Sequence, residues 1–297
     1  MNHIKDQIRC GAAYRLGLTG KGIGVAVLDT GIFLHRDFDS RVTGFADMVN
    51  RRNFAYDDCG HGTHICGIIG GSGRMSGGRY SGIAPGCNLI MVKVLDRKGN
   101  GYSSDVLAGI SWVLERKEQL GIRILNISVG ACSKRGMSEN SALVKGVNRA
   151  WDAGLVVVVA AGNNGPRTMS ITTPGISRKV ITVGCSDDDR EVLVGGNRMV
   201  DYSGRGPTAA CICKPDLVAP GCSVVSCAGR ADKYTIKSGT SMSTPIVSGA
   251  TALLLERYPD MTNKDVKLKL RESCTDIGLP RNQQGWGLLD VEKLVSK

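Results

Sequence analysis

The feature that most limits the fold is a short, valine-rich apolar run that ends in a polar residue or a turn and that recurs five times. The runs are GIGVAVLD, NLIMVKVLD, RILNISVG, LVVVVAAGN and KVITVGCS, at residues 22–29, 88–96, 123–130, 155–163 and 179–186. Apolar residues follow one another here without alternation, which is typical of strands buried on both faces. Five such strands predict a parallel sheet.

Helical patterns separate these runs. Residues 104–120 and 140–153 carry apolar side chains at spacings of three and four. Strands that alternate with helices predict an α/β fold, a three-layer α/β/α sandwich with a mainly parallel central sheet. In such sheets ligands bind at the carboxyl ends of the strands, so the residues that follow each strand are the candidates for a site.

Beyond residue 195 the text is rich in loops, and two helices follow, at residues 238–259 and from about 262 to 274. Thr262 and Asp265 have the spacing of a capping box that opens the last helix. No internal repeat or linker divides the chain. We therefore expect a single domain over residues 1–297, with residues 1–17 as a short N-terminal segment.

Composition limits the partners and the compartment. The net charge is +11, but the basic residues are dispersed and no aromatic stacking motif lies among them, which argues against nucleic acid. No apolar run approaches the roughly 20 residues of a membrane span. The sequence shows no secretory signal, and its eleven cysteines are scattered through core-like segments and loops. We expect reduced thiols and a cytoplasmic location.

The segment CGHGTHICG, residues 59–67, holds two of the four histidines between two cysteines. A structural zinc site is one interpretation, because imidazole and thiolate are zinc ligands. The spacing argues against it, since residues 61 and 64 would share a helical face while 59 and 66 would not. Buried thiols are the simpler interpretation, and we expect no metal at this segment.

Three residue types suited to acyl transfer occur where the sheet predicts a site. Asp29 ends a strand, His61 opens a small-residue helix, and Ser241 begins another helix. A hydroxyl nucleophile needs a base, and the base needs a carboxylate that orients its imidazole. Asn163 follows a strand and could donate to a developing oxyanion. Each residue alone also has a structural interpretation as a helix cap, a turn former or a packing residue.

Four segments in this order resemble the subtilisin-like serine proteases, in particular their intracellular bacterial members: VAVLDTGI, GHGTHICGIIGG, VVAAGNNG and SGTSMSTP. The resemblance extends from about residue 8 to residue 294. It implies a serine endopeptidase in which Asp29 orients the imidazole, His61 is the general base and acid, Ser241 is the nucleophile, and Asn163 helps to bind the oxyanion.

The same resemblance implies a binding groove for an extended polypeptide of broad sequence. Its two edges would be Gly99, Asn100 and Gly101 on one side and Ser128, Val129 and Gly130 on the other. Such edges bind a strand through main-chain hydrogen bonds. Ala160, Ala161 and Gly162 would form a wall of the pocket for the residue before the cut, with residues 172–175 near its base. Such small residues would admit large apolar side chains, and Thr172 would narrow the pocket.

The chain also departs from the family pattern. Asp37 matches a calcium ligand of the family, but the loop GGSGRMSGGRYSGIAP lacks the acidic oxygen donors of its partner loop. The chemistry needs no cofactor, and a structural calcium ion is left open. Intracellular relatives suggest a homodimer. Two alternatives to the enzyme stay open, a catalytically silent peptide-binding module on the same fold and a structural zinc protein.

Overall fold

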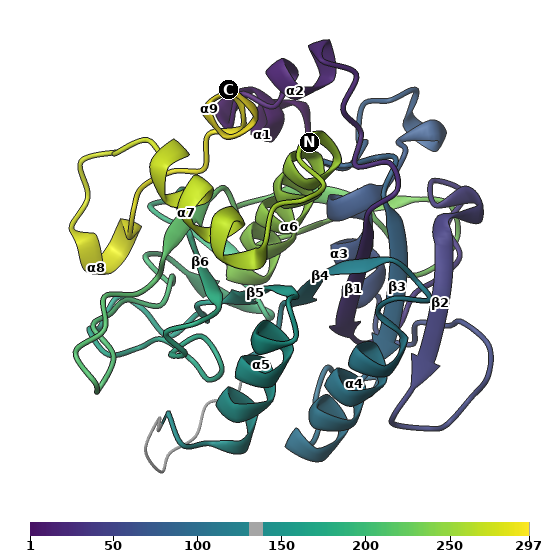
Figure 1. The fold of residues 1–297 in the computed structure, drawn as a ribbon, viewed down its shortest axis with the longest axis horizontal. Helices are drawn as coiled ribbons and strands as arrows, with labels where there is room; N and C mark the ends of the chain where they lie inside the picture. The colour runs from purple at the N-terminus through teal and green to yellow at the C-terminus, as the bar shows by residue number, and fades with distance from the viewer. Residues whose placement is uncertain (131–138, 297) are drawn as a thin grey trace.

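A parallel sheet of seven strands organises the computed structural model, which describes residues 1–130 and 139–296 (Figure 1). The strand order is β2-β3-β1-β4-β5-β6-β9, and every neighbouring pair is parallel. The strands are β1 (Gly24–Asp29), β2 (Val42–Asp47), β3 (Asn88–Lys93), β4 (Ile122–Ile127), β5 (Val156–Ala160), β6 (Ile181–Cys185) and β9 (Leu217–Ala219).

The five predicted strands are β1, β3, β4, β5 and β6, and they form the interior of the sheet. Each is almost wholly buried, as their unbroken apolar runs require. The sequence analysis missed the two edge strands. Strand β2 is only half-buried and contains Gly44, while β9 has three residues in a proline-rich segment. Neither carries the long apolar run that marked the interior strands.

Helices cover both faces of the sheet, which confirms the three-layer sandwich. Helices α4 (Ser103–Arg116) and α5 (Ala142–Asp152) run side by side at the bottom of Figure 1. Helices α3 (His61–Gly70) and α6 (Thr240–Arg257) contact each other and the sheet, and α6 crosses strands β4, β5 and β6. Nearly every side chain of α6 is buried, because it is the central helix of its layer.

Pro245 lies in the second turn of α6. A proline has no N–H to donate to the carbonyl four residues earlier, and here that carbonyl belongs to Ser241.

The remaining elements surround this sandwich. Helix α7 (Asn263–Ser273) begins with the predicted capping box of Thr262 and Asp265. Two hairpins, β7 (Val192–Val194) with β8 (Asn197–Met199) and β10 (Val224–Cys227) with β11 (Tyr234–Lys237), lie outside the sheet. Short helices complete the described chain: α1 (Asn2–Gln7), α2 (Gly11–Arg15), η1 (Asp39–Arg41), η2 (Arg74–Ser76), α8 (Arg281–Gln284) and α9 (Val291–Val295).

The N-terminal segment packs on the C-terminal helix. Ile4 and Ile8 are buried, the carbonyl of Ile8 accepts from the N–H of Val291, and Arg9 pairs with Asp290. Residues 1–17 are thus part of the folded body. Whether the whole chain is one domain stays a prediction.

Two further findings bear on composition. Among residues 1–130 and 139–296, no helix combines the length and the apolar character that crossing a bilayer requires. The ten cysteines in these residues are all free thiols, and the eleventh, Cys132, lies outside the described residues. Cys10, Cys66 and Cys185 are buried, in agreement with their core-like sequence context.

Candidate active site

The carboxyl ends of the central strands bring the predicted residues together. Asp29 is the last residue of β1 and is fully buried. Its carboxylate oxygens lie 2.8 and 2.9 Å from Nδ1 of His61, the first residue of α3. An imidazole held in this way donates from Nδ1 and keeps Nε2 available as a base.

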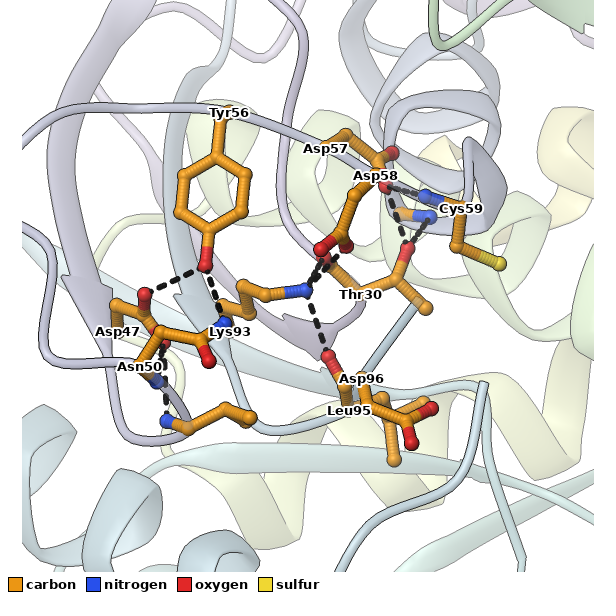
Figure 2. A network of polar contacts seen from close by, with 12 residues as sticks. Thr30, Asp47, Asn50, Tyr56, Asp57, Asp58, Cys59, Lys93, Leu95 and Asp96 are labelled. Atoms are coloured by element: carbon orange, nitrogen blue, oxygen red, sulfur yellow. Dashed lines mark hydrogen bonds and ion pairs between the residues drawn. The ribbon is translucent and has the colours of Figure 1, made fainter. Parts of the chain in front are cut away.

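Hydrogen bonds hold the loop before His61 against the residue that follows β1, Thr30 (Figure 2). The carboxylate of Asp57 accepts hydrogen bonds from the hydroxyl of Thr30 at 2.9 Å and from the N–H groups of Cys59 and Gly60. It also accepts from the N–H and hydroxyl of Thr63, in the first turn of α3. Asp57 therefore satisfies helix N–H groups that would otherwise lack partners, and it fixes the start of the helix.

Lys93 provides a second fastening of the same loop. It ends strand β3 and is fully buried, and its Nζ donates to the carbonyls of Thr30 and Leu95 and to Asp58 at 2.6, 2.8 and 2.7 Å (Figure 2). All three ammonium hydrogens thus have acceptors, as burial of a charge demands. The sequence analysis missed this residue, although a lysine within the apolar run NLIMVKVLD signals a buried partner.

The environment of His61 suits a general base. Burial lowers the pKa of this imidazole, but the charge of Asp29 and its hydrogen bond outweigh burial, so the pKa is raised above the ordinary value. The side chain is 22% exposed, which leaves it accessible from the cavity that it lines.

His64 lies one helical turn away and has a different environment. It is fully buried, and its Nε2 donates to the carbonyls of Val224 and Thr235, in β10 and β11. Burial lowers the pKa of His64 to about 3, so this imidazole is neutral at physiological pH. His64 ties α3 to the β10–β11 hairpin.

Ser241 lies in the first turn of α6 and lines the same cavity as His61, which has a volume of about 440 Å³. Its hydroxyl donates to the carbonyl of Ser128 at 2.6 Å. Within the described part of the chain this is the hydroxyl's hydrogen bond, and His61 is not its partner. The hydroxyl of Ser241 and the imidazole of His61 therefore line one cavity without being hydrogen-bonded to each other.

Asn163 follows strand β5 and also lines this cavity. Its Oδ1 accepts from the N–H and the hydroxyl of Thr240, both at 3.0 Å, so the amide hydrogens on Nδ2 are directed elsewhere. Gly239, with φ of 139°, keeps space beside them, because a Cβ at this position would lie 3.3 Å from Nδ2. The sequence analysis did not identify the orienting Thr240.

The predicted groove residues divide between two adjoining cavities. Gly99, Val129 and Gly130 line both the active-site cavity and a neighbouring cavity of about 220 Å³. Six further groove residues line one of the two. Ser128, Ala160, Gly162 and Thr172 line the first, and Asn100 and Gly101 line the second. Ala161 lines neither cavity; it is fully buried, and its carbonyl accepts from the N–H of Thr172.

Thr172 fills the space between two glycines of the groove. A Cβ on Gly130 would lie 2.2 Å from its Oγ1, and a Cβ on Gly162 would lie 2.4 Å from its Cγ2. Such distances are far below van der Waals contact, so both positions require glycine as long as Thr172 is present. The threonine side chain limits the room beside Ser241.

The cluster around Asp37 does not fit calcium. Asp37 is buried beside His35 and Cys227, and imidazole and thiol are not calcium ligands. Its carboxylate already accepts from the N–H of Met75 at 2.9 Å and from the hydroxyl of Tyr234 at 2.7 Å.

A second group of metal-ligand type among the described residues is Cys185, Asp187 and Cys222. The zinc alternative had considered residues 59, 61, 64 and 66, and these do not form such a group in the part of the chain that the structure describes.

Comparisons with known proteins agree with this geometry. The model of the subtilase family matches residues 20–287. The chain is 42% identical to serine protease AprX of Bacillus subtilis, over 93% of this chain and 65% of that protein, so it spans just under two thirds of this relative's length. It is 34% identical to subtilisin BL of Lederbergia lenta, over 97% of this chain and 96% of that one. The solved structure of sphericase superposes with a TM-score of 0.77 at 31% identity and covers 92% of this chain and 93% of its own.

Proposed function

The chain belongs to the subtilase family, and from this premise we propose that it is a serine endopeptidase with Ser241 as nucleophile. The observation that carries the proposal is the pairing of His61 Nδ1 with both oxygens of buried Asp29, at the rim of a cavity that Ser241 also lines. A fixed imidazole tautomer beside a hydroxyl is the arrangement that acyl transfer uses.

In the proposed reaction Ser241 Oγ attacks the scissile carbonyl carbon while Nε2 of His61 takes the hydroxyl proton. The imidazolium, stabilised by Asp29, gives this proton to the departing amine, and the acyl group stays on Ser241. Water then attacks the ester as His61 again removes a proton, and that proton returns to Ser241 when the acid product leaves. Every proton is carried by His61, so the chemistry needs no cofactor.

The oxyanion that forms in each step would accept from Nδ2 of Asn163 and from the N–H of Ser241. Thr240 supports this role, because it donates two hydrogen bonds to the amide oxygen Oδ1 of Asn163. The amide nitrogen Nδ2 is then the group that can donate to the oxyanion. A donor held in place before the reaction requires little reorganisation in the transition state.

The proposed substrate is a polypeptide that lies extended between residues 99–101 and 128–130 and binds through its main chain. Main-chain binding supports a broad preference. Thr172 would restrict the residue before the cut to side chains of small or medium size. We propose no nucleic-acid or membrane partner; a homodimer, a structural calcium ion away from Asp37 and a cytoplasmic location stay predictions.

The decisive experiment compares the wild type with Ser241→Ala on a casein-like unfolded protein and with a fluorophosphonate probe. We expect digestion and labelling of the wild type only, and fragment ends mapped by mass spectrometry should show varied residues before the cut. A circular dichroism spectrum identical to that of the wild type serves as the folding control for Ser241→Ala. Equal digestion by both proteins, or a wild type that the probe does not label, would sink the proposal.

A silent peptide-binding module is the second candidate, because the hydroxyl of Ser241 is bonded to Ser128 and not to His61. It predicts that the wild type binds an unfolded polypeptide without cutting it, and the same experiment therefore separates the two functions.

A further inference from the structure

A large cavity adjoins the catalytic one. It has a volume of about 770 Å³ and is lined by residues 57–60, which precede His61, and by residues of the β10–β11 hairpin and its connection. Cys59 and Lys237 line this cavity and the active-site cavity alike. The two cavities therefore adjoin each other, and the segments that lead to His61 and Ser241 form their shared border.

The acidic groups of this cavity already have partners. Asp57 accepts five hydrogen bonds from Thr30, Cys59, Gly60 and Thr63. Asp58 is paired with the buried ammonium of Lys93 at 2.7 Å, as Figure 2 shows. The charge of Asp58 is thus compensated by Lys93, and both oxygens of Asp57 already accept hydrogen bonds, so neither carboxylate is a free acceptor for a cation in the cavity.

The cations of the cavity, in contrast, lack partners. Arg230, Lys233 and Lys237 line it, and within the described part of the chain none of their side chains has a hydrogen bond or an ion pair. Arg230 and Lys233 are exposed, and Lys237 is half-buried. The charge of Lys237 also reaches His61, where it acts to lower the pKa of the imidazole. Among the described residues that line the cavity, these three cations outnumber Asp57, the carboxylate without a cationic partner, so the cavity carries net positive charge next to Asp29 and His61.

The position of the cavity decides which part of a substrate would enter it. The smaller cavity at Gly99–Gly101 shares Leu95, Gly99, Val129 and Gly130 with the active-site cavity, whereas the basic cavity shares Cys59 and Lys237 with it. The two therefore adjoin the catalytic cavity along different borders. In the proposed function the acyl part of the substrate lies along residues 99–101 and 128–130, which leaves the basic cavity for the part that departs as the amine.

We infer that the basic cavity, formed by residues 57–60 and 228–237, binds aspartate and glutamate side chains that follow the scissile bond of a polypeptide substrate. The inference rests on the proposed function for the direction in which the substrate lies. Several cations around one carboxylate attract it more than a single exposed pair does, and salt screens this attraction.

The first test uses two fluorogenic peptides that differ only by glutamate or glutamine at the second and third positions after the cut. The side chains have the same shape, so the comparison isolates the charge. We expect kcat/KM to be roughly three- to tenfold higher for the glutamate peptide at low salt. The ratio should fall towards one at about 0.5 M salt, where the screening length is only a few ångströms.

The second test reverses the charge of the cavity with the double substitution Arg230→Glu and Lys233→Glu. Neither residue is among the groups that shift the pKa of His61, whereas Lys237 is. The glutamate preference should disappear or invert. The matched control is Lys145→Glu with Lys264→Glu, which changes the net charge equally at exposed positions of α5 and α7 and should keep the preference.

The glutamate preference of Lys237→Glu is measured at about pH 9, because removing this cation also raises the pKa of His61.

Binding of both peptides to Ser241→Ala gives a readout that does not depend on hydrolysis. Equal binding of the two peptides, or a glutamate preference that survives the double substitution, would overturn the inference. If the wild type cleaves neither peptide while Ser241→Ala still binds glutamate better, the proposed endopeptidase function fails and the basic cavity stands.

Discussion

Helix α3 has one histidine at its start and another in its interior, and the pKa values of the two are shifted in opposite directions. His61 lies at the rim, where an aspartate carboxylate faces Nδ1 and part of the ring reaches the cavity. His64, one turn further, lies in a closed space where two carbonyls face Nε2. A carboxylate stabilises the imidazolium and raises the pKa of His61, whereas burial without a negative partner lowers the pKa of His64 to about 3. The hydrogen-bond partner of each imidazole, and not the residue type, therefore determines the direction of its pKa shift.

Replacement of His61 by alanine should have the largest effect. We expect kcat/KM for a peptide substrate to fall about 10⁶-fold, the size of loss that a subtilisin suffers when it loses its catalytic histidine. The free energy of unfolding should change little compared with this loss. A variant that retains more than a small fraction of wild-type activity would show that His61 is not the base.

Asp29→Asn removes the charge that distinguishes the rim from the interior and keeps the shape of the side chain. The amide cannot stabilise the imidazolium and can hold the ring in the wrong tautomer, so we expect kcat to fall about 10⁴-fold. Steady-state kinetics on one peptide substrate measure this loss. An unchanged kcat would mean that Asp29 does not orient His61.

His64→Leu should affect stability and not chemistry. It leaves the carbonyls of Val224 and Thr235 without their donor, at a cost of about 2 kcal/mol in the free energy of unfolding. His64→Gln, whose amide can still donate, should lose less. Urea denaturation and active-site titration test both variants; a loss of kcat per folded molecule equal to that of His61→Ala would erase the distinction between the two histidines.

The pH dependence gives the smallest and sharpest test. His61 must be neutral to act as a base, and its pKa is raised above 6.5, so kcat/KM should fall as the pH drops through a value above 6.5. Asn at position 29 removes the charge that raises the pKa of His61. The acid limb, the part of the pH profile in which kcat/KM falls with falling pH, should therefore move to lower pH. His64→Gln should not move the limb. A wild-type limb at or below 6.5 would contradict the raised pKa.

The sequence alone predicted the interior strands and the longer helices, because each has a strong local pattern. The motifs that resemble the family also singled out Asp29, His61, Asn163 and Ser241. Edge strand β9 was not predicted, because three apolar residues between two prolines are too few to show the pattern of a buried strand. Lys93 escaped because the acceptors for its Nζ come from residues 30, 58 and 95, on segments that are brought together only by folding.

The basic cavity was also beyond the sequence. Along the chain the basic residues are dispersed. In space Lys237 lies beside a cavity in which Asp58 is paired with Lys93 and Asp57 accepts hydrogen bonds from Thr30 and backbone N–H groups. Local excess charge depends on which groups are already paired, and pairing over such distances in sequence leaves no local pattern.

The hydrogen bond from Ser241 to the carbonyl of Ser128 links the proposed nucleophile to one edge of the proposed substrate groove. A substrate main chain that lies along residues 128–130 would offer its own N–H to this carbonyl and compete with the serine hydroxyl. Occupancy of the groove would then release the hydroxyl towards His61. Part of the substrate's binding energy would be used to prepare the enzyme and would not appear as affinity. For a short substrate without that N–H, kcat would therefore be reduced more than KM is changed. Without a polypeptide in the groove, the hydroxyl of Ser241 would stay hydrogen-bonded to Ser128 and would not react.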